Sequence, residues 1–408
     1  MNNIDIKTLD NGLQIILNQD KTKYRTTARI FVKAGGLDVK SKEKEFPYGI
    51  AHFLEHYLIE HSIYGNISEI LSNEYISSNG ITSYHNTEYY ISTVHDFEEN
   101  FLKLINVVNN PVFEQENIEM TKKPIIQEIK RAKDKVGREF LHTVYKNTFK
   151  NKIFDTTLGE IDTIESIDVN ILQQYHKTFY NPSNQIIVIT GNFDDDIIDI
   201  IEKEYQMFNN SSVERLIIDE PNEVINKVEK ITDTTKPIDF FEITYKVNIK
   251  ELIPNEKNKL DYYLSYILNS NFGERSDLFN FLIENKLTIY SIEANYDPSI
   301  LKDFVIISIT VYTSKQDEVI EMILDKFNNL CINEEDLNNW KNRQIIKNIC
   351  SSENKEWVSN NLTGNILLYD LYCYDDIDLI KSLNVEECKN LMDRLEYKYY
   401  TITINDLK

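Results

Sequence analysis

The chain has 408 residues, of which 41% are hydrophobic, and a formal net charge of -22 at pH 7. That length is too great for one ordinary hydrophobic core and predicts two domains of about 200 residues each. The negative charge argues against nucleic acid and anionic membranes as partners, because both would be repelled, and would favour basic peptides. An acidic surface also simply keeps proteins in solution, so charge alone does not identify a substrate.

No apolar run approaches the roughly 18 residues of a membrane span, and the residues after Met1 lack a basic and then apolar signal segment. The cysteines lie in the last quarter of the chain without Cys-x-x-Cys spacing, which argues against a disulfide framework or a thiolate zinc site. They are Cys331, Cys350, Cys373 and Cys388. We therefore expect a soluble, unexported protein with free thiols in the cytoplasm.

The first half of the sequence predicts a mixture of strands and helices. Runs rich in β-branched and aromatic residues predict strands, and apolar residues at three- and four-residue steps predict helices. Gly35-Gly36 marks a turn before a helix that begins near Gly49, and His85-Asn86 marks a turn between two strands. The predicted strands are Leu13–Leu17, Thr27–Val32, Tyr75–Tyr84, Thr87–Val94 and Gln185–Thr190, and the predicted helices are Asp96–Asn109, Gln115–Lys133, Arg138–Asn147 and Asp195–Tyr205.

A polar tract at Asn209–Asn222 contains Asn209-Asn210-Ser211-Ser212 and Pro221, which predicts a linker. We place the domains at 1–212 and 223–408, with the linker at 213–222. The second half repeats the mixture of elements and predicts another α+β domain. Its predicted strands are Phe240–Val247, Thr288–Ala294, Phe304–Val311 and Tyr399–Ile404, and its predicted helices are Lys257–Leu268, Asp277–Asn285 and several from Gln316 onward.

The segment Gly49–His56 contains His-x-x-Glu-His, the inverted zinc-protease signature. Positions i, i+3 and i+4 of a helix share one face, so His52, Glu55 and His56 would form one stripe with both imidazoles facing one ion. Average composition gives this motif by chance in about one chain in a hundred. The presence of a third ligand therefore distinguishes a metal site from a chance match.

Catalytic zinc sites normally take three protein ligands and leave one position for water. The helix predicted over Gln115–Lys133 carries a core-facing stripe of isoleucines, and Glu128 falls inside that stripe. A carboxylate at a core position needs a partner, which makes Glu128 a candidate ligand. The alternative is an ordinary boundary glutamate that pairs with Lys130 or Arg131.

Several segments match one known family in the right order and over nearly the whole chain. The sequence resembles the pitrilysin/insulinase-type inverzincins, and in length it is similar to mitochondrial-processing-peptidase subunits and their bacterial relatives. The segments that carry the resemblance are Gly49–His56, Pro124–Ile129, Leu158–Ile164, Tyr180–Asn184 and Phe272-Gly273 followed by Tyr290-Ser291.

The resemblance implies an α+β fold of two homologous α/β domains, each a mostly antiparallel sheet flanked by helices, that together form half of a clamshell. It implies one Zn²⁺ per chain, with His52, His56 and Glu128 as ligands and Glu55 as general base. The first domain would then be catalytic, and the second would clamp the substrate and contribute to dimerisation. The implied reaction is endopeptidase cleavage of short or unfolded peptides, including a peptide precursor, inside a dimeric chamber.

Members of the family add the peptide substrate to an edge strand near the metal, and Asn79, Gly80, Ile81 and Thr82 resemble that strand. Main-chain pairing of this kind gives affinity with little dependence on sequence. Asn79 would bond the substrate backbone, and the alternative is an ordinary turn-capping asparagine. Tyr290 would help to hold the substrate, and the alternative is a core-facing strand tyrosine.

Two positions depart from the family pattern. Thr121 stands where relatives carry a second glutamate, so support for the zinc site would be weakened or supplied by Glu119. Ile283 stands where relatives carry an arginine that helps Tyr290 hold the substrate. Because isoleucine cannot donate a hydrogen bond, we expect the zinc-bearing subunit of a heterodimer whose partner supplies the arginine, although homodimers also occur. The alternative function is a non-catalytic scaffold or binding subunit.

Overall fold

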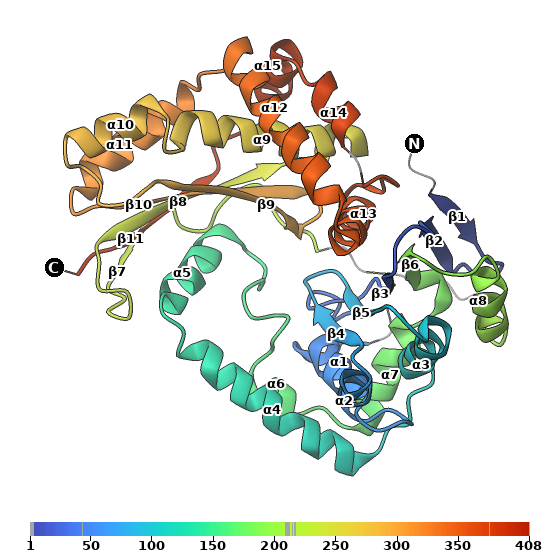
Figure 1. Cartoon of the computed structure of the whole chain (residues 1–408). Coiled ribbons are helices and arrows are strands. Elements are labelled where there is room, and N and C mark those ends of the chain that lie inside the picture. Colours follow the sequence, from blue (N-terminus) through green and yellow to red (C-terminus); the bar gives the residue numbers. More distant parts are fainter. Residues whose placement is uncertain are drawn as a thin grey trace. The chain divides into compact units, whose positions relative to one another are not determined.

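The computed structural model describes residues 4–407 except 43, 209–212, 214, 216, 217 and 375, and the chain divides into two compact units (Figure 1). Unit 1 comprises Met1–Lys133, Asp155–Ile218 and Ser352–Thr363. Unit 2 comprises Asp134–Phe154, Asp219–Ser351 and Gly364–Lys408. Of the predicted linker, residues 214, 216 and 217 lie outside the described part of the chain.

Unit 1 is built on a six-stranded sheet with the strand order β1-β2-β6-β3-β5-β4. All neighbouring strands are antiparallel except β2 and β6, which are parallel. β6 and β3 lie in the middle and are buried along their whole length, which is why their sequences are mostly apolar and β-branched, with Arg29 and Gln185 as buried polar exceptions. The strands are β1 (Asp5–Thr8), β2 (Gln14–Gln19), β3 (Thr26–Val32), β4 (Ser77–Thr82), β5 (Thr87–Thr93) and β6 (Gln185–Gly191).

Helices pack their apolar faces against this sheet. Ile15, Ile30 and Ile187 of the sheet share one core with Phe53 and Leu54 of the motif helix. The helices are α1 (Ile50–Glu60), α2 (Ile67–Asn73), α3 (Phe97–Asn109), α4 (Gln115–Lys133), α6 (Ile161–Glu165), α7 (Val169–Phe179) and α8 (Ile197–Tyr205), with a short 3₁₀ turn at Pro182–Asn184.

Unit 2 repeats the design with a five-stranded sheet in the order β7-β11-β8-β10-β9, in which only β7 and β11 pair in parallel. The strands are β7 (Val228–Ile231), β8 (Phe240–Asn248), β9 (Glu293–Leu301), β10 (Phe304–Tyr312) and β11 (Tyr400–Asn405). The helices are α5 (Arg138–Thr148), α9 (Pro254–Phe272), α10 (Asp277–Glu284), α11 (Gln316–Asn328), α14 (Ile377–Ser382) and α15 (Val385–Asp393). Two more helices have residues in both units: α12 (Glu334–Ser352), of which only Ser352 is in unit 1, and α13 (Lys355–Tyr369). Two mostly antiparallel sheets flanked by helices confirm the expected α+β class.

One predicted strand is wrong. Thr288–Ala294 was expected to be extended, but the strand is β9 and begins only at Glu293. The Thr288 hydroxyl lies within hydrogen-bond distance of the carbonyl oxygens of Tyr290, at 2.9 Å, and Tyr312, at 3.2 Å, so this stretch bends before the strand. Pro298 lies inside β9, which is possible because β9 is an edge strand and a proline there removes no ladder hydrogen bond.

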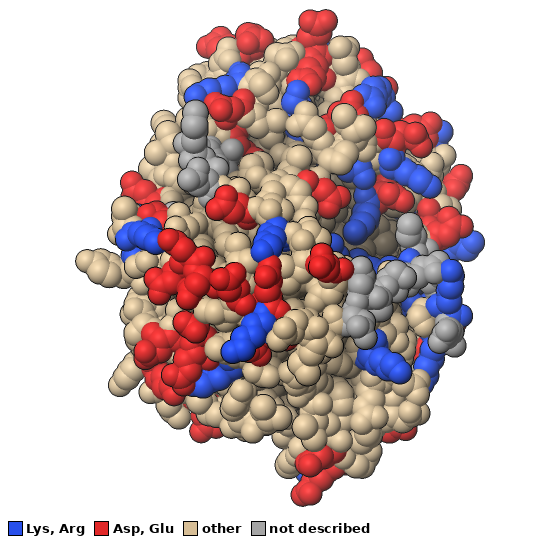
Figure 2. All heavy atoms as spheres, turned by 90° about the vertical axis from the view of Figure 1, so that its right-hand side faces the viewer, with Lys and Arg blue, Asp and Glu red and all other residues tan. Residues whose placement is uncertain are grey.

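The surface carries charges of both signs. Acidic side chains form several groups on the face shown in Figure 2, with lysine and arginine side chains near them and uncharged residues over much of the rest, as on an ordinary solvated surface. In the described part of the chain, no helix combines the length and hydropathy needed to cross a membrane. All four cysteines have free thiols.

Candidate metal centre

A glycine fixes the start of the motif helix. Gly49 caps α1 with φ of 85°, a left-handed conformation that side chains rarely adopt. A Cβ there would lie 2.8 Å from both the Leu158 carbonyl oxygen and Ile164 Cδ1, so only glycine permits this close approach. The apolar face of α1 is buried in the core of unit 1, which leaves the histidine face toward α4.

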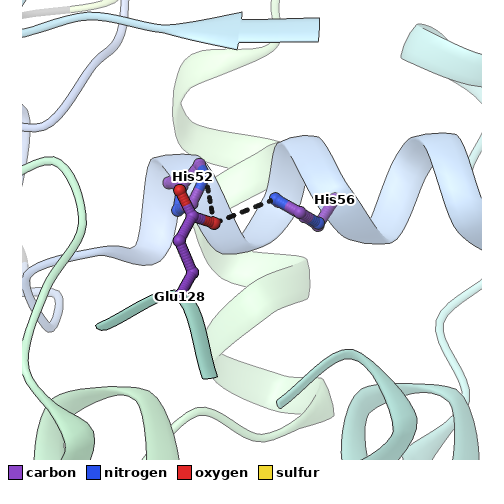
Figure 3. Close-up of side chains that lie close together, drawn as sticks. All are labelled: His52, His56 and Glu128. Carbon is purple, nitrogen blue, oxygen red and sulfur yellow. Dashed lines mark ion pairs between the residues drawn. The ribbon is translucent and has the colours of Figure 1, made fainter. Parts of the chain in front are cut away.

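Three candidate ligands converge from α1 and α4 (Figure 3). His52 Nε2 lies 3.8 Å from Glu128 Oε2, and His56 Nε2 lies 3.9 Å from the same oxygen. One ligand atom from each residue lies within 4.8 Å of the other two. The side chain of Glu128 is 43% exposed, so the residue lies at the edge of the apolar stripe and not inside it as the sequence pattern predicted.

This arrangement fits a zinc ion. Zinc–nitrogen and zinc–oxygen bonds of about 2.0–2.2 Å place tetrahedral ligand atoms about 3.3–3.6 Å apart. The two histidine–glutamate separations are a few tenths of an ångström longer, and no pair of the three ligand atoms is more than 4.8 Å apart, so a closure of the order of an ångström would complete the site. Two imidazoles and one carboxylate are also the donor set of many catalytic zinc sites that keep one position open.

Glu55 lies beside these residues in an enclosed position. It is only 7% exposed, and its Oε2 accepts a hydrogen bond of 2.7 Å from the Thr82 hydroxyl of β4. Burial raises the pKa of Glu55 above its ordinary value, although the hydrogen bond from Thr82 opposes that shift. A buried carboxylate with a raised pKa is a stronger proton acceptor than one in water, as a general base requires.

The two histidines differ in their electrostatic surroundings. Burial, with a smaller contribution from His56, lowers the pKa of His52 to about 3, so this imidazole stays neutral and available to a metal. Burial also acts to lower the pKa of His56, but the carboxylates of Glu60, Glu55 and Glu128 outweigh it and raise that pKa. His56 Nδ1 lies 3.2 Å from Glu60 Oε1, a contact that orients the ring.

Protons should therefore compete with zinc mainly at His56. Because the pKa of His56 is raised above the ordinary 6.5, we expect zinc affinity to fall as the pH decreases through neutrality. Glu60→Gln removes the carboxylate that contributes most to this shift and should move the midpoint of the loss to lower pH. Competition with a chromophoric chelator between about pH 5 and 8 measures both midpoints. Equal midpoints in the two proteins would contradict this role of Glu60.

β4 runs past Glu55 at the edge of the sheet. Asn79 and Ile81 are exposed, Thr82 holds Glu55, and Gly80 is buried against it. A Cβ at Gly80 would lie 2.6 Å from Glu55 Cγ and Oε1 and from Ile59 Cδ1. The absence of a side chain at Gly80 thus lets the strand and the candidate base lie in contact.

Gly80→Ala should displace the Glu55 carboxylate. We expect kcat/KM for peptide cleavage to fall by about 100-fold, because a shift of the order of an ångström in a reacting group costs that much. Bound zinc should remain, since none of the three candidate ligands is touched. Ser77→Ala, at an exposed position of the same strand, is the matched control and should retain wild-type kinetics. Wild-type activity in Gly80→Ala would show that Glu55 tolerates the displacement.

The remaining predicted residues lie away from these contacts. Thr121 is fully buried on α4, and its hydroxyl donates to the Asn117 carbonyl oxygen at 3.0 Å. Glu119 accepts hydrogen bonds from Gln115 and Lys122 on the exposed side of α4. In unit 2, Tyr290 is 56% exposed and is not in a strand, so it is available to a ligand.

Sequence reasoning missed Glu60. The signal was present, because Glu60 stands four residues after His56 and the i, i+4 positions of a helix are neighbours. The His-x-x-Glu-His motif ends at His56 and does not include Glu60.

Two family models match consecutive parts of the chain. The model described as Insulinase (Peptidase family M16) matches residues 14–160, and the model described as Peptidase M16 inactive domain matches residues 166–344. The chain belongs to peptidase family M16. The predicted resemblance to pitrilysin and insulinase is therefore confirmed.

M16 relatives include named zinc proteases. The chain is 24% identical over 398 residues to a protein of Bacillus subtilis (strain 168) named uncharacterized zinc protease YmfH, an alignment that covers 94% of this chain and 92% of YmfH. It is 21% identical over 249 residues to a protein named as mitochondrial-processing peptidase subunit beta from Arabidopsis thaliana, covering 59% of this chain and 46% of that protein.

Solved M16 structures share the fold. A protein from Alicyclobacillus acidocaldarius, described as an M16-like peptidase, superposes with a TM-score of 0.85 at 20% identity and covers 98% of this chain and 97% of its own. The periplasmic protease PqqL of Escherichia coli superposes with a TM-score of 0.79 at 17% identity, covering 99% of this chain but 48% of PqqL. The chain thus has the fold of one half of a longer M16 protease, as expected for half of a clamshell.

Proposed function

We propose that the protein is a zinc-dependent endopeptidase that cleaves short or unfolded peptides. The observation that carries the proposal is the convergence of His52, His56 and Glu128 within 4.8 Å, beside a buried Glu55. The names of the M16 relatives as zinc proteases support it. The proposed arrangement has a catalytic domain at 1–212 and a substrate-clamping domain at 223–408.

His52, His56 and Glu128 would hold one zinc ion per chain. When bound, zinc supplies Lewis acidity that polarises the scissile carbonyl and acidifies a water molecule. Glu55 would accept the proton of the attacking water and later return it to the leaving amine. Thr82 restrains the Glu55 carboxylate through its 2.7 Å hydrogen bond, so the base is positioned before substrate arrives.

The substrate would pair its backbone with the free edge of β4. Among the residues that the structure describes, β4 is the last strand of its sheet and pairs only with β5, so its outer hydrogen-bonding groups face outward. Asn79, Gly80, Ile81 and Thr82 belong to this strand, and the Thr82–Glu55 contact brings it to the candidate base. Main-chain recognition suits peptides that are short or unfolded, because a folded protein has few free strands.

We propose further that the active species is a dimer. Tyr290 is exposed in unit 2, but Ile283 offers no donor where relatives carry an arginine. A second M16-like subunit would supply the arginine, which makes this chain the zinc-bearing member of a heterodimer. The cytoplasm stays the expected location, although PqqL of E. coli is named a periplasmic protease.

Metal analysis and a quenched-fluorescence peptide assay on the purified chain test the proposal. We expect one zinc per chain, cleavage that stops on chelation and cleavage that returns when zinc is added. Full activity from the chain alone would contradict the heterodimer and favour a homodimer. Bound zinc without cleavage, even after the partner is added, would favour the alternative of a non-catalytic scaffold, which the Ile283 and Thr121 departures support.

A further inference from the structure

The strand proposed to bind peptide needs support at its turn. β4 has a neighbouring strand on one side only, so its position depends on the β4–β5 hairpin and on the contacts that hold it. The hairpin turn is closed by a hydrogen bond of 2.8 Å from the Ser83 amide to the Asn86 carbonyl oxygen and by one of 3.2 Å from the Asn86 amide to Ser83 Oγ. An edge strand that moves at its turn would present its peptide groups poorly to a substrate.

A neighbouring loop, residues 35–38, holds this turn through the backbone. The Gly36 amide donates to the Ser83 carbonyl oxygen at 2.8 Å, and the Leu37 amide donates to the Tyr84 carbonyl oxygen at 2.9 Å. A Cβ at Gly35 would lie 2.4 Å from the Ser83 carbonyl oxygen, so the loop lies against the turn at a distance that only glycine allows. The position of the hairpin therefore depends on the position of this loop.

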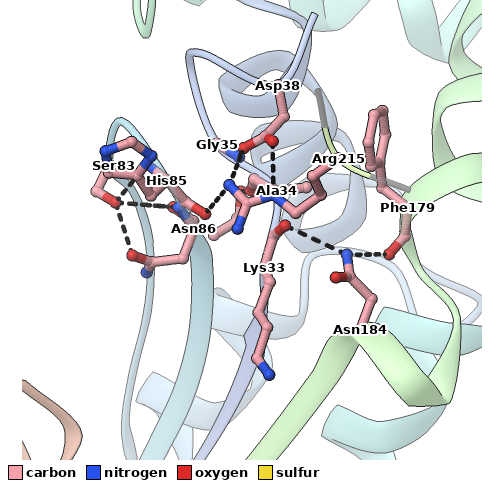
Figure 4. A network of polar contacts seen from close by, with 11 residues as sticks. Lys33, Ala34, Gly35, Asp38, Ser83, His85, Asn86, Phe179, Asn184 and Arg215 are labelled. Atoms are coloured by element: carbon pink, nitrogen blue, oxygen red, sulfur yellow. Dashed lines mark hydrogen bonds and ion pairs between the residues drawn. The ribbon is translucent and has the colours of Figure 1, made fainter. Parts of the chain in front are cut away.

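One arginine joins the loop to the turn (Figure 4). Arg215 donates from Nε to Asp38 Oδ1 and from Nη2 to Asp38 Oδ2, each at 2.7 Å, and Nη2 also donates to the His85 carbonyl oxygen at 3.1 Å. Asp38 Oδ2 accepts a further hydrogen bond of 2.8 Å from the Gly35 amide. Asp38 is 6% exposed, so hydrogen bonds from protein donors take the place of water at its carboxylate.

We propose that Arg215 is a positioning residue for the peptide-binding strand, acting through Asp38 and the β4–β5 turn. The inference rests on the proposed function, because it assigns Arg215 to the site through β4. The bidentate contact between Arg215 and Asp38 requires a guanidinium. An ammonium is a point charge that cannot bind both carboxylate oxygens and the His85 carbonyl oxygen in a fixed plane. Arg215 touches neither substrate nor candidate ligand and acts only through the hairpin.

Steady-state kinetics and amide hydrogen exchange on the whole protein test the inference. We expect Arg215→Met and Arg215→Lys to raise KM by roughly tenfold, more than they lower kcat, with zinc content unchanged. Amides of the turn and of β4 should exchange at least about ten times faster than in wild type. Arg394→Met is the matched control, because Arg394 also binds a carboxylate, that of Glu256, but in unit 2.

If Arg215→Met folds poorly because Asp38 is left charged and buried, Asp38→Asn/Arg215→Met removes that charge and should show the same rise in KM. A rise in KM that is equal for Arg215→Met and Arg394→Met would overturn the inference. Unchanged exchange of the hairpin amides would overturn it as well. The exchange measurement does not require activity, so an inactive wild type would refute the proposed function while the exchange data still decide the role of Arg215.

Discussion

Glu55→Gln is expected to keep zinc bound and to lower kcat for peptide cleavage by about 10²–10⁴-fold. A positioned general base contributes a factor of this size, and glutamine has the shape of glutamate without its basicity. The amide can still accept the hydrogen bond that Thr82 donates to the Glu55 carboxylate, so the local geometry should be kept. Metal analysis alongside single-turnover kinetics measures both quantities.

Glu69→Gln supplies the control for this experiment. Glu69 is an exposed glutamate in the first turn of α2, so the same chemical change there should leave kcat unaltered. A Glu55→Gln protein that cleaves peptide at the wild-type rate would remove Glu55 from the mechanism. Loss of zinc together with loss of activity would instead mean that Glu55 supports the metal site.

Much of the fold and the centre of the site could be predicted from the sequence because strong local signals coincide there. The helix α4 was predicted with the bounds it has, Gln115–Lys133, since its apolar residues repeat at helical spacing over the whole stretch. The residues 52, 55 and 56 could be placed together because a helix alone brings them to one face. The stripe of α4 and the family resemblance both made Glu128 a candidate ligand, but the packing of α4 on α1, which brings Glu128 to that face, has no local signal in the sequence.

What the sequence could not provide depends on contacts between distant segments. Thr82 holds Glu55 across 27 residues and Arg215 holds Asp38 across 177, and neither pair has a periodic pattern or a fixed spacing. The Thr288–Ala294 error also involves a distant partner, because the Thr288 hydroxyl and the Ile289 amide both contact the carbonyl oxygen of Tyr312, on the neighbouring strand, before β9 begins. Local propensity carries no information about such partners.

Glu128→Gln is expected to weaken zinc binding by at least about 100-fold. At the zinc concentration that saturates the wild type, the variant should not cleave peptide. Replacing even an outer partner of a metal ligand costs about 10–100-fold in affinity, and Glu128 is a candidate ligand itself. The neutral amide would leave only the two imidazoles as strong donors. Chelator competition measures the affinity, and activity titrated against added zinc tests whether excess metal restores cleavage.

The same variant separates a metal role for Glu128 from a role in folding. Its side chain is 43% exposed at the edge of α4, so the metal-free protein should melt within about 1–2 °C of wild type. Glu116→Gln, at an exposed position in the first turn of the same helix, should keep both zinc affinity and activity. Wild-type zinc affinity in Glu128→Gln would mean that Glu128 is a boundary glutamate and that the third ligand lies elsewhere. That result would leave His52 and His56 as a motif without a complete site, which is the state expected of a non-catalytic M16 subunit.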